Sequence, residues 1–183
     1  MKEIVISILL VSLFTTYDIR QQRNFEQAHT RSEKQDTQQS EVGPVPSPTP
    51  DPRSSRVAKF FRKYNSPLES NAEDFVEAAD QNEIDYKVLA SIAMVESTGG
   101  KHTPSCAKFN PFGWTSSSSP CGFWRFTSFS EAINHVAEQI HTSHFYSNFR
   151  RTGQIKELAH SYNLGNEEWI ASMEYFLRDL ESL

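Results

Sequence analysis

The chain has 183 residues, with 18 lysines and arginines against 23 aspartates and glutamates, and a net charge of −5. This length is sufficient for one domain with a hydrophobic core, and it leaves further residues outside that domain. The acidic balance and the lack of a basic stripe interleaved with aromatic residues argue against nucleic acid as a partner.

Residues 1–18 have the pattern of a leader. Lys2 precedes an apolar run from Ile4 to Phe14, which is too short for a comfortable membrane span and suits a secretory signal. The residues around Phe14 to Tyr17 lack the small-x-small pattern of a cleavage site, so an uncleaved membrane anchor over residues 4–14 is the alternative. In both cases we expect an exported, extracytoplasmic protein of the cell envelope.

Residues 19–53 are rich in Gln, Ser, Thr, Glu and Pro, and include the proline-rich stretch Gly43 to Pro52. Such a segment carries too little apolar surface to fold, so we expect a disordered linker. The folded domain is therefore predicted over residues 54–183.

The patterning of that domain predicts a mainly helical fold. A short amphipathic helix is expected over Arg56–Tyr64. Ser70 with Glu73 forms a capping-box pattern before the next apolar repeat. Asp85 is then the expected N-cap of a helix that ends in Glu96.

The C-terminal half is predicted to add three helices. Ser128 with Glu131 gives a second capping box before an apolar helix. A shorter helix is expected to begin at Gly153, and Asn166 is the expected N-cap of the last helix.

Residues 99–127 are rich in Gly, Pro, Ser and aromatic residues without helical period, which predicts a long functional loop. We expect at most a small β-hairpin in it, around Phe112–Trp114 and Gly122–Phe126. Cys106 and Cys121 both lie in this loop, and in an exported domain such a pair is more often bridged than free. A disulfide is therefore expected, with a reduced pair as the alternative.

Glu96 stands near the end of the otherwise apolar helical stretch Val88 to Gly100. Helical spacing makes Leu89, Ile92 and Ala93 its neighbours on one face, so the carboxyl should lie against apolar groups. Desolvation raises the pKa of a carboxyl, and the negative end of the helix dipole acts in the same direction. Such a group is a proton donor near neutral pH, as glycosidic bond cleavage requires; the alternative is an ordinary solvated helix end.

Three segments complete a pattern: Glu96-Ser97 at a helix end, Asn110 to Trp114 in the loop, and Ser161 to Gly165 before the last helix. In this order they resemble the motifs of the lysozyme-like superfamily, in particular lytic transglycosylases and goose-type lysozymes. That family carries a Glu-Ser pair at a buried helix end, an Asn-x-x-Gly stretch and an Ala-Tyr-Asn-Ala-Gly-like motif. The resemblance extends over about residues 68–180 and implies a lysozyme-like fold.

A second resemblance lies in the segment from Phe123 to Ile133. It looks like the Phe-Arg-x-Tyr stretch and the following helix start of bacterial autolysin N-acetylglucosaminidase domains, which have the same fold. One departure from the transglycosylase pattern follows Gly113. Where that family commonly reaches a Gln, this chain has Trp114, Thr115 and a run of serines.

The resemblance implies cleavage of peptidoglycan between MurNAc and GlcNAc, with Glu96 as the single acid and base. Glu96 would protonate the glycosidic oxygen while the N-acetyl group of the substrate stabilises the anomeric carbon. It would then take the proton of the C6 hydroxyl as a 1,6-anhydro ring closes.

The resemblance also implies roles for residues around the acid. Tyr162 would orient the carboxyl or the N-acetyl group, and Asn110 and Asn163 would contact sugar amides or hold loop backbone. Ser97 would form a hydrogen bond either near the acid or at the helix end. From its residue type, we expect Trp114 to stack on a sugar ring or to pack against the cystine.

Residues 97–130 contain no Asp or Glu, so the loop offers no second carboxylate for ordinary glycoside hydrolysis. This gap favours the transglycosylase reading. The alternative within the same fold is a hydrolytic N-acetylglucosaminidase or lysozyme that uses Glu131 or Glu69 to handle water. An alternative of another class is a non-catalytic cell-wall-binding module.

No cofactor and no metal are expected. His141 and His144 are spaced to share a metal only if a third ligand converged on them, and the two cysteines lack the CxxC spacing of a zinc site. We expect a monomer whose partner is the glycan strand.

Overall fold

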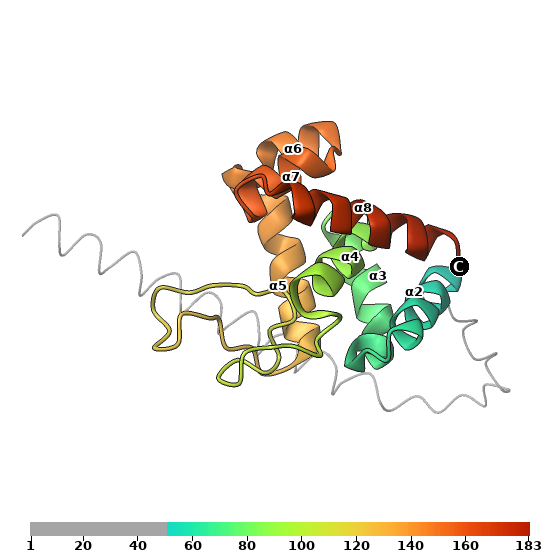
Figure 1. Cartoon of the computed structure of the whole chain (residues 1–183), viewed down its shortest axis with the longest axis horizontal. Helices are drawn as coiled ribbons and strands as arrows, with labels where there is room; N and C mark the ends of the chain where they lie inside the picture. Colours follow the sequence, from blue (N-terminus) through green and yellow to red (C-terminus); the bar gives the residue numbers. More distant parts are fainter. Residues whose placement is uncertain (1–50) are drawn as a thin grey trace, which may run out of the picture. The chain divides into compact units, whose positions relative to one another are not determined.

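The computed structural model describes residues 51–183, which form a mainly helical domain (Figure 1), as predicted. The predicted leader over residues 1–18, and the linker as far as residue 50, lie outside the described residues. In the described part, none of the helices has the length and apolar character needed to cross a membrane.

The domain contains seven α-helices and two short 3-10 helices within its described residues. In chain order they are α2 (Pro52–Lys63), η1 (Pro67–Asn71), α3 (Ala72–Gln81), α4 (Tyr86–Ser97), α5 (Phe129–Thr142), η2 (His144–Tyr146), α6 (Ser147–Thr152), α7 (Ile155–Tyr162) and α8 (Glu167–Glu181).

Helix α4 is the centre of the domain. Most of its side chains are buried on every side, from Val88 through Met94, as expected of a helix without a polar face. Helix α8 packs across α4, while α3 packs against α4, α2 and α5. The partly exposed residues of α4 lie at its two ends: Tyr86 and Lys87 in the first turn, and Val95 and Glu96 in the last.

The N-terminal boundaries differ in two places from the sequence predictions. Helix α2 begins at Pro52 rather than Arg56, because the Asp51 side chain accepts the backbone N–H of Arg53 at 2.7 Å and Pro52 suits a first helical turn. Residues 51–53, which the sequence analysis assigned to the linker, therefore belong to the N-cap and first turn of α2. The capping box at Ser70 is wrong, because Ser70 lies inside η1 and α3 begins only at Ala72.

The C-terminal helices show one further error. Gly153 does not open a helix but ends one, since it takes the left-handed conformation, with φ of 67°, after the unpredicted helix α6. Helix α7 then starts at Ile155.

Three predicted N-caps are confirmed. The side chains of Asp85, Ser128 and Asn166 each accept a backbone N–H in the first turn of the following helix. The box at Ser128 is only half formed, because the Glu131 carboxylate accepts the backbone N–H of Thr127 instead of that of Ser128.

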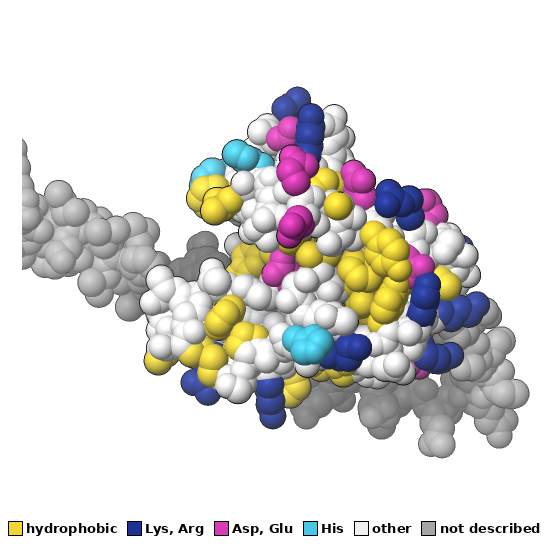
Figure 2. Space-filling view, in the orientation of Figure 1, with side chains coloured by type: hydrophobic (Ala, Val, Ile, Leu, Met, Phe, Trp, Pro, Cys, Tyr) yellow, Lys and Arg dark blue, Asp and Glu magenta, His cyan; other side chains and the backbone are white. Residues whose placement is uncertain are grey.

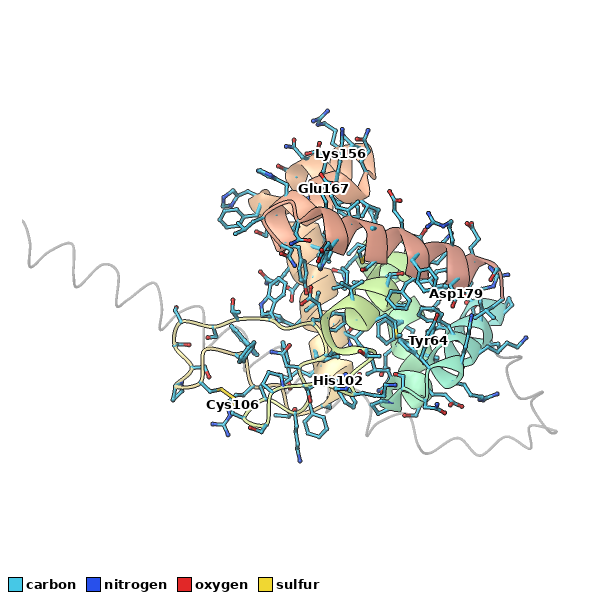
Figure 3. All side chains as sticks on the ribbon, in the orientation of Figure 1. Tyr64, His102, Cys106, Lys156, Glu167 and Asp179 are labelled. Carbon is cyan, nitrogen blue, oxygen red and sulfur yellow. A yellow bond between two sulfur atoms is a disulfide. The ribbon has the colours of Figure 1, made fainter. Side chains whose placement is uncertain are left out.

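The loop between α4 and α5 has little regular structure, as expected. Its one β-bridge joins Thr115 to Phe123, and the Trp124 N–H donates to the Trp114 carbonyl at 2.8 Å. The predicted disulfide between Cys106 and Cys121 is confirmed, and Figure 3 shows Cys106 in the loop, well away from the α8 start at Glu167.

Replacement of both cysteines by serine should destabilise the domain. The bridge spans a sequence separation of 15 residues, so its removal is expected to lower the free energy of unfolding by about 3 kcal/mol in the chain-entropy model. Urea unfolding of the parent and the double variant, followed by circular dichroism, measures this loss. An unchanged unfolding midpoint would show that the cystine does not stabilise the fold.

Candidate active site

Glu96 occupies the last turn of α4, and the chain leaves the helix directly after it. Thr98, Gly99 and Gly100 all have positive φ, between 53° and 83°, which ends the helix abruptly. Gly99 is required here, because a Cβ on it would stand 2.5 Å from the Ser66 hydroxyl oxygen. The helix end is thus fixed against the start of η1, and the position of Glu96 is fixed with it.

The Glu96 carboxyl is half-buried, and burial raises its pKa above the ordinary value of 4.5. A hydrogen bond from the Trp169 indole opposes this shift in part, because it stabilises the ionised form. The expected desolvation of Glu96 is therefore confirmed. The group has the character of a carboxylic acid that holds its proton to higher pH than an exposed glutamate.

Trp169 is the closest polar partner of Glu96, and the sequence analysis missed it. Its indole Nε1 donates to Glu96 Oε1 at 2.7 Å from the first turn of α8, where the Asn166 cap places it. The sequence placed Trp169 only on the apolar face of a helix. A buried indole N–H requires an acceptor, but the sequence does not indicate which acceptor it meets.

The other oxygen of Glu96 faces the backbone of the loop. A Cβ on Gly113 would lie 3.0 Å from Glu96 Oε2, and Gly113 has a φ of 61°. Glycine therefore lets the backbone approach the carboxyl closely, with no side chain between them. The Asn-x-x-Gly stretch and the acid come together in the structure.

Ser97 and Asn110 hold this loop rather than point into open space. The buried Ser97 hydroxyl lies 2.7 Å from the Pro111 carbonyl oxygen and accepts the Gly100 N–H at 2.8 Å. The fully buried Asn110 amide donates to the carbonyls of Trp114 and Trp124 at 2.8 and 3.0 Å. For Asn110 the geometry provides the loop-holding role. For Ser97 it provides the helix-end role, since the hydroxyl also lies 3.1 Å from the Ala93 carbonyl oxygen of the same helix.

Tyr162 lies beside the acid, at the end of α7. Its hydroxyl donates to the Phe112 carbonyl at 2.8 Å, and its ring stacks on Trp169 with centroids 5.7 Å apart. Burial, followed by the negative charge of Glu96, raises the pKa of Tyr162 well above 10.0, so the phenol stays protonated. Tyr162 fixes the peptide that precedes Gly113. The half-buried Asn163 side chain makes no hydrogen bond to the described part of the chain.

An aromatic surface extends from the acid across the loop. Trp114 contacts Tyr162 and His135 edge-on, and Trp124, which is 39% exposed, stacks on His135 with centroids 4.7 Å apart. Desolvation lowers the pKa of His135, which keeps its ring neutral at pH 7. Such flat, partly exposed rings suit the apolar faces of sugars.

The loop and the α6–α7 pair lie at opposite ends of α5 (Figure 1), and the surface is notched between them in the space-filling view (Figure 2). Glu96 has neighbours from both sides of this notch. Gly113 belongs to the loop, and Trp169 belongs to the first turn of α8, which follows α7. The acid therefore sits where the two parts meet.

The two alternative carboxylates are engaged elsewhere. Glu131 accepts the N–H and the hydroxyl of Thr127, both at 2.6 Å, which lowers its pKa. Glu69 is bound to the Arg62 guanidinium at 2.7 Å. Neither carboxylate contributes to the pKa shift of Glu96.

In residues 51–183 no three His, Cys, Asp or Glu side chains gather as a metal site, and His141 and His144 have no third ligand there.

No protein-family model matches the chain, and no curated protein is significantly similar to it. The site offers one half-buried carboxyl, held between an indole N–H and a glycine backbone, beside a protonated phenol and a row of aromatic rings.

Substitution of Glu96 by Gln should change the pH dependence of stability. Because burial raises the folded-state pKa of Glu96 above 4.5, the folded protein loses stability as pH rises through that pKa. The glutamine variant has no such ionisation, so its free energy of unfolding relative to the parent should increase with pH. Urea unfolding between about pH 4 and pH 7 measures the difference. A difference that stays constant with pH would contradict the raised pKa.

Substitution of Trp169 by Phe should raise the pKa of Glu96 further. The indole bond lowers that pKa, so its removal leaves desolvation unopposed. Carbon-13 NMR titration of the glutamate side-chain carboxyls measures the shift. Trp124→Phe is the matched control, because the Trp124 indole does not contact Glu96, and it should leave the Glu96 titration unchanged.

Proposed function

We propose that this chain cleaves peptidoglycan glycan strands between MurNAc and GlcNAc by the lytic transglycosylase reaction. The observation that carries this proposal is the setting of the Glu96 carboxyl. One of its oxygens receives the Trp169 indole N–H at 2.7 Å, and the other faces the backbone at Gly113. A carboxyl that is fixed in position and has a raised pKa is suited to general acid catalysis of glycosidic bond cleavage.

The proposed reaction has two steps. In the first, protonated Glu96 gives its proton to the glycosidic oxygen as the bond from that oxygen to C1 breaks, and the N-acetyl oxygen of the substrate bonds to C1. In the second, the Glu96 carboxylate takes the proton of the C6 hydroxyl, whose oxygen bonds to C1 and displaces the N-acetyl oxygen. A 1,6-anhydro ring forms, no water is consumed, and Glu96 is again protonated.

The neighbours of Glu96 have positioning roles in this proposal. Trp169 would keep one carboxyl oxygen as a hydrogen-bond acceptor and so direct the proton to the other oxygen. Tyr162 acts through the Phe112 carbonyl, which it holds at 2.8 Å, and thereby keeps Gly113 against the acid. Trp114 and Asn163 remain available to the substrate, because Trp114 is partly exposed and the Asn163 amide has no partner within residues 51–183.

The isolation of Glu96 favours transglycosylation over hydrolysis. A two-carboxylate glycosidase needs a second carboxyl across the bond, within about 10 Å of the first. The loop from residue 97 to 130 has no acidic residue, and both Glu131 and Glu69 are bound to other groups. A reaction in which the substrate supplies its own nucleophile removes this requirement.

Disulfides are typical of proteins in oxidising compartments outside the cytoplasm, and this chain has one. Peptidoglycan also lies outside the cytoplasm. We therefore include in the proposal that the chain is exported and acts in the cell envelope.

Glu96→Gln should abolish cleavage of purified cell-wall sacculi. General acid catalysis contributes about 10²- to 10⁴-fold, so the rate of muropeptide release should fall by at least that range. Release is followed by chromatography, and the products are identified by mass. The parent should release 1,6-anhydro ends; reducing ends, which are heavier by one water, or about 18 mass units, would instead identify a hydrolase.

The controls are Glu131→Gln and Glu69→Gln, which remove the two alternative carboxylates. Both variants should keep the parent rate under the single-acid mechanism. Loss of activity in either, with the fold retained, would argue for a two-carboxylate hydrolase. Equal and negligible release by the parent and by Glu96→Gln would overturn the enzymatic proposal in favour of a wall-binding module.

A further inference from the structure

The outer end of the loop contains a recess that the proposed reaction does not use. It has a volume of about 310 Å³ and combines hydroxyl groups, one indole and one guanidinium. Its lining consists of Ser116, Ser118, Ser119, Pro120, Trp124 and Arg125. This volume is at the lower end of those typical of small-molecule sites, about 300–1,000 Å³.

The charge of this recess is positive and locally uncompensated. Arg125 is exposed and makes no ion pair or hydrogen bond with any residue between 51 and 183. By contrast, Arg53 and Arg62 are each paired with a carboxylate. No acidic residue occurs between residues 97 and 130, although the whole chain has a net charge of −5. The recess is therefore a cationic site on an acidic protein.

The recess is held in shape by the loop around it. The Ser116 N–H donates to the Gly122 carbonyl at 2.9 Å, and the neighbouring Cys121 is tied to Cys106. The Asn110 amide holds the Trp124 carbonyl at 3.0 Å. Because the backbone around the pocket is fixed in this way, the group that a ligand still has to order is the exposed Arg125 side chain.

A row of ring contacts connects the recess to Glu96. Neighbouring ring centres along this row are 4.7 to 5.9 Å apart. The row consists of Trp124, His135, Trp114, Tyr162 and Trp169. Trp169 is buried at the acid end of this row, whereas Trp114 is partly exposed and Trp124 is exposed. A sugar chain in contact with Trp114 and Trp124 would extend from the neighbourhood of the acid to the recess.

We infer that the recess is a subsite for the carboxylate carried by the substrate strand, either on the lactyl ether of MurNAc or on its stem peptide. This inference rests on the proposed function. A guanidinium binds a carboxylate through two parallel hydrogen bonds, and serine hydroxyls can donate to or accept from sugar and amide groups. The Trp124 indole supplies a face for the sugar or the peptide stem. The subsite makes the enzyme select acidic, muramic-type glycans over neutral polymers of N-acetylglucosamine.

The test is a titration of the full chain carrying Glu96→Gln, which prevents turnover, monitored by NMR. The chain has three tryptophans, so the indole N–H signals of Trp124 and Trp169 separately report on the recess and the acid. The probes are N-acetylmuramic acid, N-acetylmuramoyl-L-alanyl-D-isoglutamine and neutral tri-N-acetylchitotriose. Comparison of the first two distinguishes a lactyl from a peptide carboxylate.

Addition of Arg125→Gln should lower the affinity for the better-binding acidic probe roughly ten-fold, which corresponds to the loss of one charge-assisted hydrogen bond. It should leave the affinity for tri-N-acetylchitotriose unchanged. Arg56→Gln is the matched control, because it removes the same charge from the exposed side of α2 and should leave both affinities unchanged. An unshifted Trp169 signal in each variant confirms that the fold is retained.

Three outcomes would overturn the subsite: no shift of the Trp124 signal with either acidic probe, equal affinities in Arg125→Gln and its parent, or equal losses in Arg125→Gln and Arg56→Gln. These results are separate from the sacculus assay. If the parent cleaves sacculi and Arg125→Gln does not change the binding of the acidic probes, only the subsite inference is refuted. If binding depends on Arg125 but no cleavage occurs, the proposed reaction is refuted and the chain is a wall-binding protein with an acidic-sugar site.

Discussion

The burial of α4 is the constraint on which the rest of this domain depends. Because the helix is apolar on nearly all sides, it must lie at the centre, and only its two ends are partly exposed. A carboxyl in that turn cannot be fully hydrated, and it meets the Trp169 indole on one side and the Gly113 backbone on the other. The raised pKa of Glu96 thus follows from the packing of the core, without a second charge beside it.

The loop after α4 is built around the same point. Its segments are joined by side-chain hydrogen bonds to backbone carbonyls, since the loop has almost no sheet of its own. Ser97 binds it to the helix end, Asn110 ties its two tryptophan-bearing stretches together, and Tyr162 holds it from α7. These side chains come from three separate segments of the chain: Glu96-Ser97, Asn110 to Trp114, and Ser161 to Gly165. Their role in this structure is to assemble the surroundings of one acid.

The sequence was sufficient to predict the helical class, the disulfide, three N-caps and the unusual setting of Glu96, because each depends on local pattern or on composition. It failed where a residue has two compatible roles. Serine is a favoured N-cap residue, but Ser70 lies inside the 3-10 helix η1. Glycine occurs at the end of a helix as well as before its beginning, and Gly153 is at an end. Trp169 could not be assigned to Glu96 from sequence, because they are 73 residues apart and only tertiary packing makes the indole a donor to the acid.

The hydrogen bonds of Asn110 have a consequence for how a polymer would be bound. One buried amide accepts from Trp114 and donates to the carbonyls of both Trp114 and Trp124, so side-chain hydrogen bonds join the two loop segments that carry the indoles. The backbone that carries the aromatic rings is therefore ordered when the domain folds. Its loss of conformational entropy belongs to folding and does not reduce the free energy of ligand binding. A glycan chain would meet a surface already in its final shape and would adapt to it through its own glycosidic torsions.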